Sequence, residues 1–548
     1  MSHVTGADQP PLLDITIGAM LAEAAARDPE GLALIARHQQ VRLSWRELKR
    51  RTDAVASGLL AAGIERGDRV GIWAPNCVEW TILQFATAAA GMILVTINPA
   101  YRSSEAEYAL KKVGCRALVT ATRHKSSDYM AMLREVIPEL EQAVPGALHS
   151  ANLPDLRLIA TLGDEAQAGC LRFDALEIEI DDERLTAIPV HPDDAVNIQF
   201  TSGTTGFPKG ATLTHRNILN NGYFVGAQMG LTAADRICIP VPLYHCFGMV
   251  MGNLACLAHG ATMVYPAESF DPLAVLETVA EEGCTALYGV PTMFIAILAQ
   301  PEFDSFDTSS LRTGIMAGSP CPVATMLEVI SRLGMHQVTI GYGMTETSPI
   351  SFQSAMDSPL EQRVTTVGKV QPHLEVKIVG PDGETLPLGE AGELCTRGYS
   401  VMLGYWDDPA RTTEAIDAEG WMHSGDIATL DEQGYCRITG RIKDMVIRGG
   451  ENIYPREIEE FLMTHPAIMD AQVIGVPDER FGEELCAWVR TRGGSDIGED
   501  DVRAHCSGRI AHYKVPKYIR IVSEFPMTVT GKVQKFVMRD RMIAELAG

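Results

Sequence analysis

Residues Thr201–Gly210 read TSGTTGFPKG and hold three glycines, four hydroxyl residues and one lysine. In the segment just before them, Ala195–Phe200, apolar residues alternate with polar ones, which predicts a β-strand. Glycines let backbone N–H groups approach a ligand closely, and hydroxyl groups add further donors. The stretch therefore predicts a strand that leads into a cradle for an anion with several oxygens, most simply a polyphosphate.

This stretch has two other interpretations. A Walker phosphate loop needs Gly-Lys-Ser/Thr after a four-residue gap, whereas here Pro208 precedes Lys209 and Gly210 follows it. The other two Gly-Lys pairs, at Gly368 and Gly531, are each followed by valine. A flexible turn is the usual outcome of Gly/Ser/Thr composition. The strand in front and the lysine behind favour the phosphate cradle.

Length, composition and charge limit the class of protein. At 548 residues the chain exceeds what one hydrophobic core usually serves, so we expect two or more domains. Apolar residues make up 46% and charged residues 21%, which is typical of a folded soluble protein. A net charge of −24 repels nucleic acid and anionic membranes, so we expect neither as a partner.

The cysteines and the apolar stretches indicate the cellular compartment in which the protein resides. The twelve cysteines are scattered, with no Cys-x-x-Cys pair and no Cys/His cluster at metal-binding spacing, which predicts buried thiols in a reducing compartment. The N-terminal MSHVTGADQPPLLD lacks the basic and apolar regions of a secretory signal. Polar residues interrupt the most apolar stretch, Trp80–Ile97, so we expect a core helix running into a strand. These features predict a cytoplasmic protein without integral membrane association.

The order of helical and strand patterns predicts the domain organisation. The two patterns alternate along most of the chain, which indicates layered α/β architecture. Residues 364–441 have Gly- and Asp-rich turns between short strands, which indicates a β-rich subdomain. The last hundred residues have a smaller α+β pattern, with expected helices at Pro455–Met463 and Val533–Leu546. We predict a large N-terminal domain, residues 1–442, and a small mobile C-terminal domain, residues 443–548.

Three further motifs offer groups for nucleotide chemistry, although each alone has a structural explanation. In GYGMTE, residues 341–346, Thr345 and Glu346 offer oxygens to a phosphate-bound Mg²⁺, or they belong to an ordinary turn. SGD, residues 424–426, and GRIKD, residues 440–444, supply a carboxylate and a guanidinium. A carboxylate can accept bonds from both ribose hydroxyls. Surface charges near a turn are the alternative.

Two further motifs contain a histidine and a lysine whose residue types alone do not indicate one function. VPLYHCFG, residues 241–248, places Tyr244 and His245 between a proline and a glycine, where a structural histidine is the alternative. TVTGKVQK, residues 528–535, places Lys532 in a glycine turn, where a solvated lysine is the alternative.

In this order the motifs closely resemble those of the adenylate-forming superfamily, which includes acyl-CoA synthetases, firefly luciferase and the adenylation domains of peptide synthetases. The resemblance covers nearly the whole chain, from Leu48 to Lys532. The phrases GYGMTETSP, GRIKDMVIRGGENIYPREIE and VPKYIRIVSEFPMTVTGKVQK are similar to bacterial fatty-acyl-CoA synthetases of the medium-chain type.

This resemblance implies a two-step ligase reaction. ATP and a carboxylic acid first give an acyl-adenylate and pyrophosphate, and the thiol of coenzyme A then displaces AMP. The implied cofactors are ATP, Mg²⁺ and coenzyme A. Because an anionic carboxylate must attack an anionic phosphate, we expect catalysis by positioning and charge neutralisation.

The resemblance also implies a role for each residue at the ATP site. Glu346 would hold Mg²⁺, and Thr345 would lie at the α-phosphate. Asp426 would bind the ribose hydroxyls with Arg441 beside it, and Lys532 would reach the α-phosphate and the carboxylate. The β- and γ-phosphates would be wrapped by Thr201, Ser202, Gly203, Thr204, Thr205, Gly206 and Lys209, and the adenine would lie between Gly318-Ser319-Pro320 and Gly341-Tyr342-Gly343.

For the thioester step, the resemblance implies that the small domain pivots at Lys443. Gly449 and Gly450 would then line the pantetheine channel, with His245 as its movable gate. The acyl pocket would be lined by Phe247, Met249 and Val250, by Met316, Ala317 and Gly318, and by residues 347–350.

The resemblance leaves several alternatives open. A medium-chain fatty acid fits the apolar pocket best, but a short thioether acid or an aryl acid fits nearly as well. An adenylating enzyme that loads a separate carrier protein and a non-catalytic nucleotide or acyl sensor are the other two functions. The sequence does not determine the oligomeric state, and a homodimer is one alternative.

Overall fold

The computed structural model describes residues 1–201, 208–319, 321–448, 451–492, 495, 497–507, 509–528 and 531–547, with backbone alone at 451, 452 and 547. It divides into two compact units. The larger unit comprises residues 5–375 and 396–422, and the smaller unit comprises residues 1–4, 376–395 and 423–548. The predicted mixed α/β class is confirmed. The proposed domain limit at Lys443 stays a prediction.

An eight-stranded sheet of the larger unit carries the Thr201–Gly210 stretch. Its order is β10-β9-β6-β4-β5-β11-β12-β22, parallel from β10 to β11 and antiparallel from β11 onward. Thr201 pairs with Lys209 across β11 and β12, so the loop between them starts and ends at neighbouring positions. The strands are β4 (Arg69–Trp73), β5 (Ile93–Thr96), β6 (Ala117–Thr120), β9 (Leu158–Thr161), β10 (Leu171–Arg172), β11 (Ala195–Thr201), β12 (Lys209–Thr214) and β22 (Gly404–Tyr405).

A nine-stranded sheet of the same unit carries the GYGMTE motif. Its order is β19-β18-β17-β16-β15-β13-β14-β2-β3, and the six strands from β17 to β2 are parallel. Parallel sheets are covered on both faces, which fits the almost wholly buried strands here. The strands are β2 (Leu32–Ala36), β3 (Val41–Ser44), β13 (Arg236–Cys238), β14 (Thr262–Tyr265), β15 (Ala286–Gly289), β16 (Thr313–Ala317), β17 (Gln337–Gly343), β18 (Ile350–Gln353) and β19 (Lys369–Val370).

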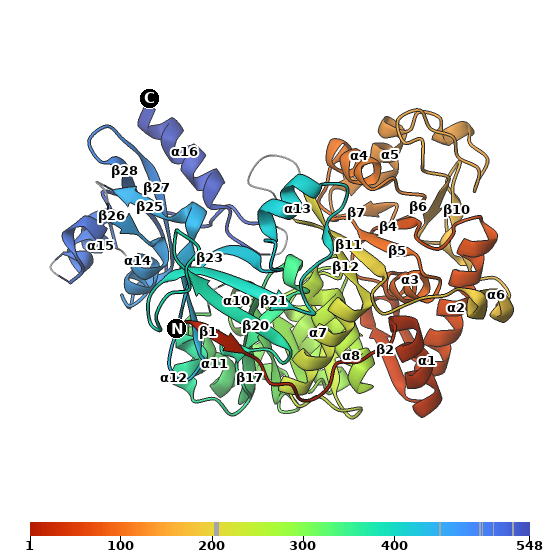
Figure 1. Cartoon of the computed structure of the whole chain (residues 1–548), viewed down its shortest axis with the longest axis horizontal. Coiled ribbons are helices and arrows are strands. Elements are labelled where there is room, and N and C mark those ends of the chain that lie inside the picture. The colour runs from red at the N-terminus through yellow and green to blue at the C-terminus, as the bar shows by residue number, and fades with distance from the viewer. Residues whose placement is uncertain are drawn as a thin grey trace. The chain divides into compact units, whose positions relative to one another are not determined.

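Helices cover these sheets, as Figure 1 shows. Helices α9, α10 and α11 pack with one face of the nine-stranded sheet in one apolar cluster. The opposite face shares a larger cluster with α1, α2, α3, α7 and α8. The helices are α1 (Ile17–Arg27), α2 (Trp45–Ala61), α3 (Val78–Ala89), α4 (Ser103–Lys112), α5 (Tyr129–Val136), α6 (Asp182–Ala187), α7 (His215–Gln228), α8 (Ala255–His259), α9 (Pro272–Glu282), α10 (Pro291–Leu298), α11 (Val323–Arg332), α12 (Leu360–Thr365) and α13 (Pro409–Ala415).

Local sequence explains where several helices begin. Ser44 caps α2 by accepting from the Glu47 amide, and the Glu47 side chain accepts from the Ser44 amide in return. Pro272 and Pro291 occupy the first turns of α9 and α10, where a missing N–H costs nothing. A π-helix, η4 (Phe247–Leu254), precedes α8 and is wholly buried. Such irregular turns are frequent at functional sites.

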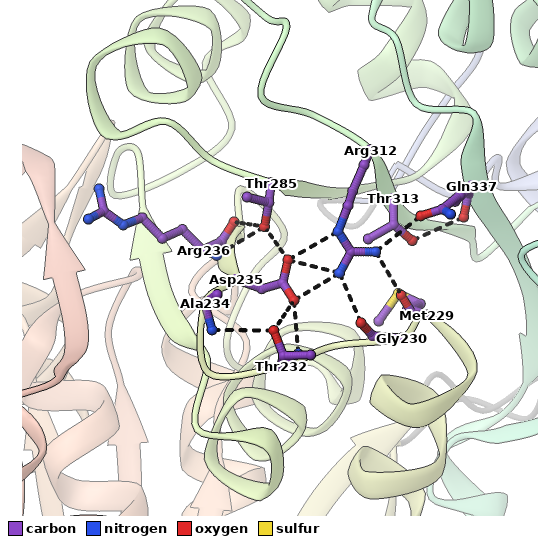
Figure 2. Close-up of polar contacts among 10 residues, drawn as sticks. All are labelled: Met229, Gly230, Thr232, Ala234, Asp235, Arg236, Thr285, Arg312, Thr313 and Gln337. Carbon is purple, nitrogen blue, oxygen red and sulfur yellow. Dashed lines mark hydrogen bonds and ion pairs between the residues drawn. The ribbon is translucent and has the colours of Figure 1, made fainter. Parts of the chain in front are cut away.

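An ion pair between the half-exposed Arg312 and the buried Asp235 joins the amino-terminal ends of the parallel strands. Figure 2 shows the Asp235 carboxylate between the Arg312 guanidinium, at 2.8 Å, and the Thr285 hydroxyl, at 2.7 Å. These residues immediately precede β13, β16 and β15. Arg312 also donates to the carbonyl oxygens of Gly230 and Met229, just past the end of α7. The cluster therefore ties a helix end to the sheet edge opposite the GYGMTE motif.

The predicted β-rich segment forms a five-stranded sheet of order β1-β20-β21-β23-β24. Asp426 in β23 pairs with Arg441 in β24 across an antiparallel ladder. A two-stranded pair, β7 (Arg123–His124) with β8 (Ser127–Asp128), lies in the larger unit. The five strands are β1 (His3–Thr5), β20 (Leu374–Val379), β21 (Gly392–Gly398), β23 (Met422–Leu430) and β24 (Cys436–Arg441).

The C-terminal part of the smaller unit has a sheet of order β26-β25-β28-β27, with β29 paired to β28. One face shares an apolar cluster with α14 and α15, and the other face packs against α16 through Met538 and Met542. The elements are β25 (Val446–Arg448), β26 (Glu451–Ile453), α14 (Pro455–Leu462), β27 (Ile468–Asp478), β28 (Gly482–Thr491), α15 (Glu499–Cys506), β29 (Tyr518–Ile521) and α16 (Lys535–Ala547).

The expected elements are present with small shifts at their ends. The stretch 80–97 forms α3 and β5, as predicted. β17 continues into the GYGMTE motif through Gly341–Gly343, because it pairs with β16 and β18 on its two sides, so the first half of this motif is strand. None of the helices formed by the described residues combines the length and apolar character needed to cross a bilayer.

Candidate active site

Four side chains of the larger unit meet where β11, β12, β22 and the short helix η6 (Thr345–Thr347) come together. The Tyr405 hydroxyl donates to Glu346 Oε1 at 2.8 Å, and the Thr201 hydroxyl donates to the same oxygen at 3.4 Å. The Lys209 ammonium donates to the Tyr405 oxygen at 3.3 Å and lies 4.4 Å from the centre of its ring. Thr201, a predicted phosphate-site residue, thus contacts Glu346, the predicted metal ligand, directly. Lys209, another predicted phosphate-site residue, contacts Tyr405, the hydrogen-bond partner of Glu346.

Tyr405 is the residue that the sequence did not predict. Burial, followed by the charge of Glu346 and its hydrogen bond, raises the pKa of Tyr405, so the phenol stays protonated and donates. Its segment is anchored by two backbone bonds, from the Met402 amide to the Glu346 carbonyl and from the Trp406 amide to the Gly210 carbonyl. The antiparallel pairing of β22 with β12 therefore delivers Tyr405 to the site.

The GYGMTE motif lies at the carboxyl end of β17. Thr345 and Glu346 are 9% and 6% exposed. Gly343 has no room for a side chain, because a Cβ there would lie 1.7 Å from the Pro349 carbonyl oxygen. Gly318 and Ser319 follow the neighbouring strand β16 at the same edge of the sheet. Ligands bind at the carboxyl ends of parallel strands in folds of this type.

His245 lies just before the π-helix. Its Nδ1 accepts from the Phe247 amide at 3.1 Å, and its carbonyl accepts from the Gly248 amide at 3.0 Å. The Cys246 thiol lies 3.5 Å from His245 Nδ1 and 3.9 Å from the Thr345 hydroxyl. The structure therefore brings the His245 turn next to the GYGMTE motif.

The residues expected at the acyl pocket fall into two groups. Phe247, Met249 and Val250 of the π-helix share an apolar cluster with Ala317 and Ile350. Met316 packs in the cluster on the opposite face of the nine-stranded sheet, because successive residues of a strand point to opposite faces. The structure thus separates Met316 from the other expected lining residues.

The predicted ribose pair lies in the smaller unit. Arg441 Nε donates to Asp426 Oδ1 at 2.9 Å, and Asp426 is 7% exposed. The Asp426 amide donates to the Ser424 hydroxyl at 3.1 Å, and that hydroxyl donates to the Leu394 carbonyl at 2.6 Å. These bonds fix the carboxylate on a rigid sheet.

The other predicted residues of this unit lie in turns. Lys532 closes a turn with Thr528, whose amide donates to the Lys532 carbonyl at 2.7 Å and whose hydroxyl accepts from the Lys532 amide. Lys443 lies in a single exposed turn, η7 (Ile442–Asp444). The predicted residues outside the described part of the chain are Ser202, Gly203, Thr204, Thr205, Gly206, Pro320, Gly449 and Gly450.

Comparison with known proteins settles the family. The family model of the AMP-binding enzyme matches residues 21–406, and that of the AMP-binding enzyme C-terminal domain matches residues 457–532. The chain belongs to the AMP-binding enzyme family. The predicted adenylate-forming resemblance is thereby confirmed.

Relatives within the AMP-binding family match over nine-tenths or more of their length. The mitochondrial medium-chain acyl-CoA ligase ACSF2 of Danio rerio is 46% identical, over 100% of this chain and 91% of that protein. The YngI protein of Bacillus subtilis is 47% identical, over 97% of this chain and 98% of that protein. The crystal structure of the anthranilate CoA ligase AuaEII with anthranoyl-AMP has a TM-score of 0.86 at 27% identity, covering 98% and 99% of the two chains.

Proposed function

We propose that this AMP-binding enzyme is an ATP-dependent ligase that joins a medium-chain fatty acid to coenzyme A through an acyl-adenylate. The observation that carries this proposal is the similarity, over 99–100% of this chain, to medium-chain acyl-CoA ligases at 44–46% identity. The predicted class, an acid–thiol ligase, is confirmed by the same relatives. The carrier-loading and sensor alternatives are not favoured.

The first half-reaction joins the acid to AMP. A carboxylate oxygen attacks the α-phosphorus of ATP, the bond to the bridging oxygen breaks, and pyrophosphate leaves with that electron pair. Both reactants are anions, so the site must neutralise charge. In the proposal, Lys209 and Thr201 contact the β- and γ-phosphates, with Ser202, Gly203, Thr204, Thr205 and Gly206 of the same loop. Lys532 supplies a second positive charge at the α-phosphate and the carboxylate.

The donors around Glu346 fit Mg²⁺. One carboxylate and the Thr345 hydroxyl are hard oxygen ligands, and Mg²⁺ takes one or two protein oxygens together with substrate phosphates. When bound, the ion neutralises charge on the phosphates. Tyr405 donates to only one oxygen of Glu346, so it orients the carboxylate without consuming both oxygens.

The nucleoside and thioester roles also remain proposals. Asp426 accepts bonds from the ribose hydroxyls, with Arg441 holding the carboxylate in place. Gly318, Ser319 and Pro320, and Gly341, Tyr342 and Gly343, form the adenine site. For the thioester step a C-terminal domain from Lys443 onward rotates, Gly449 and Gly450 line the pantetheine channel, and His245 gates it.

The apolar surroundings of the π-helix support a straight fatty acid. Phe247 and Met249 are buried, and the Met249 carbonyl accepts from the Gln84 amide group at 3.2 Å, which fixes this turn. Each methylene buried contributes about 0.8 kcal/mol, or roughly fourfold in affinity. Catalytic efficiency should therefore rise by about this factor for each carbon added until the pocket is full.

Location and oligomeric state stay predictions. The animal relatives are mitochondrial by name, so the predicted cytoplasmic location is open to test by fractionation. A homodimer is tested by light scattering on the purified chain.

The test of the function is a panel of carboxylic acids, assayed separately for pyrophosphate release and for loss of the coenzyme A thiol. The panel contains straight acids of increasing length, a short thioether acid and an aryl acid. Medium-chain acids should give the highest kcat/KM in both assays. Pyrophosphate release without thiol loss would support carrier loading, and no release with any acid would support a sensor.

A further inference from the structure

Three side chains on one face of the five-stranded sheet have the composition of a transition-metal site. Glu393 and Cys395 are two positions apart in β21, so both side chains point to the same face. His423 belongs to β23, the neighbouring strand in the sheet (Figure 1). One ligand atom of each residue lies within 4.8 Å of the other two. We call these three residues the β21–β23 triad.

The distances within the triad are close to those of a metal-bound set. His423 Nδ1 lies 2.9 Å from Glu393 Oε2 and 3.5 Å from Cys395 Sγ. Ligands of a tetrahedral zinc ion lie about 3.4 Å apart for nitrogen and oxygen and about 3.6 Å apart for nitrogen and sulfur, from the usual bond lengths. The two distances from His423 Nδ1 are thus about 0.5 Å and about 0.1 Å shorter than in that geometry. The ligand atoms of Glu393 and Cys395 lie within 4.8 Å of each other.

From this arrangement we infer that the β21–β23 triad binds a borderline divalent ion, of the class of Zn²⁺ or Co²⁺. A thiolate, an imidazole and a carboxylate suit these ions, whereas Mg²⁺ prefers oxygen ligands alone. Binding requires a His423 Nδ1 that carries no proton and a thiolate at Cys395, so it releases protons. The site is thus distinct in chemistry from the Glu346 site.

The triad is partly exposed, so a metal ion can reach it from solvent. Cys395 is buried, while the side chains of His423 and Glu393 are 31% and 21% exposed. A metal ion therefore has access on one side, and three protein ligands leave one position for water. The ligands lie on paired strands instead of loops, which limits the entropy lost on binding.

The triad also adjoins the segment that carries Asp426. The second oxygen of Glu393, Oε1, accepts from the Gly425 amide at 3.0 Å. A metal on Oε2 leaves this bond in place, so metal and Gly425 would hold the two oxygens of one carboxylate. Metal binding should then stabilise the β21–β23 pairing, and it should raise the midpoint of thermal unfolding.

The test uses the full-length chain, reduced and freed of metal, titrated with Co²⁺ alone. Thiolate-to-cobalt charge-transfer absorption should grow to one ion per chain, and Zn²⁺ should displace it. Cys395→Ser should abolish the band. Glu393→Gln should weaken binding by more than roughly tenfold, since even outer partners of a metal contribute about 10–100-fold.

Cys321→Ser is the matched control, because Cys321 is the one cysteine of the chain that is partly exposed, and all twelve cysteines lie in its described part. That variant should keep the band. The inference is overturned if the band persists in Cys395→Ser, if it vanishes in Cys321→Ser, or if wild type gives no band. Should Cys395→Ser not fold, unchanged affinity in Glu393→Gln overturns it equally.

Discussion

The phenol of Tyr405 donates a 2.8 Å hydrogen bond to the carboxylate of Glu346, although 59 positions separate the two residues in the chain. The same phenol oxygen accepts from the Lys209 ammonium. One neutral hydroxyl thus lies between the proposed metal ligand and the proposed phosphate-binding lysine. Tyr405 is a positioning residue in this interpretation, since it acts through both neighbours.

Tyr405→Phe should lower kcat/KM for adenylation by roughly ten- to hundredfold, because a hydrogen bond to a charged group contributes about 1.5–3 kcal/mol. The apparent Mg²⁺ requirement should rise as well, which a merely structural role would not produce. Pyrophosphate release at varied Mg²⁺ measures both. Tyr399→Phe, which removes the hydroxyl of a half-buried tyrosine of the same unit, should leave both values near wild type.

Lys532→Ala should reduce adenylation by about 10²–10³-fold, the usual cost of losing one charge-stabilising contact. Thioester formation from supplied acyl-adenylate should fall much less, because the proposed role of Lys532 is confined to the first step. The two half-reactions are assayed separately. Lys514→Ala is the control, since Lys514 forms an ion pair with the exposed side chain of Glu457 in the same unit. An equal fall in both half-reactions would contradict the two-step assignment.

Asp426→Ala should raise KM for ATP by roughly five- to hundredfold, since removing one partner of a buried polar contact costs about 1–3 kcal/mol. The effect should appear in KM more than in kcat, because the ribose does not react. Initial rates at varied ATP separate the two constants. Glu432→Ala removes an exposed carboxylate from the turn after β23, and it should change neither KM for ATP nor kcat. An ATP dependence unchanged by Asp426→Ala would place the ribose elsewhere.

Lys443→Pro should trap one orientation of the C-terminal domain, because proline fixes φ near −65° and restricts the residue before it. If the trapped orientation brings Lys532 to ATP, adenylation survives and thioester formation collapses. Pyrophosphate release and acyl-CoA production are measured on a variant with wild-type circular dichroism. Lys443→Ala keeps a rotatable φ and should support both steps. Wild-type rates of both steps in Lys443→Pro would move the pivot to another residue.

Arg312→Met should destabilise the larger unit by about 1–3 kcal/mol, because the buried Asp235 carboxylate loses its cation but keeps its hydroxyl partners. KM for ATP should stay unchanged, since the cluster in Figure 2 lies at the sheet edge opposite the GYGMTE motif. Denaturant unfolding measures the first effect. Arg46→Met, which breaks an exposed pair with Glu30, should have little effect.

The stability supplied by Asp235 should also depend on pH. Burial alone raises the pKa of Asp235, but hydrogen bonds from Thr285, the Thr232 amide and Arg312 outweigh it and hold that pKa below its ordinary value of 3.8. A lowered folded pKa means that the contribution is present above about 3.8 and is lost as the pH falls through the folded pKa. The difference between wild type and Arg312→Met should therefore be constant near neutral pH and shrink in acid.

The sequence by itself determined the α/β class, the strand before Thr201–Gly210, the family and its reaction. The family and its reaction follow from the resemblance of the motifs, in their order, to those of adenylate-forming enzymes. The class and the strand follow from short-range patterns, namely alternation in strands and helix periodicity. Such patterns extend over a few residues, so they can be recognised in a single sequence. The end of β17 was the exception, because pairing with β16 and β18 extends it through two glycines that look like a turn.

The tertiary structure alone decided which distant residues meet. Tyr405 reaches Glu346 and Lys209 because β22 pairs with β12, and Met316 faces away from Ala317 because neighbouring strand residues point to opposite faces. The β21–β23 triad has no signature at metal-binding spacing, since His423 follows Cys395 by 28 positions. Sheet register sets these contacts, and register depends on the packing of the whole chain instead of on any local stretch.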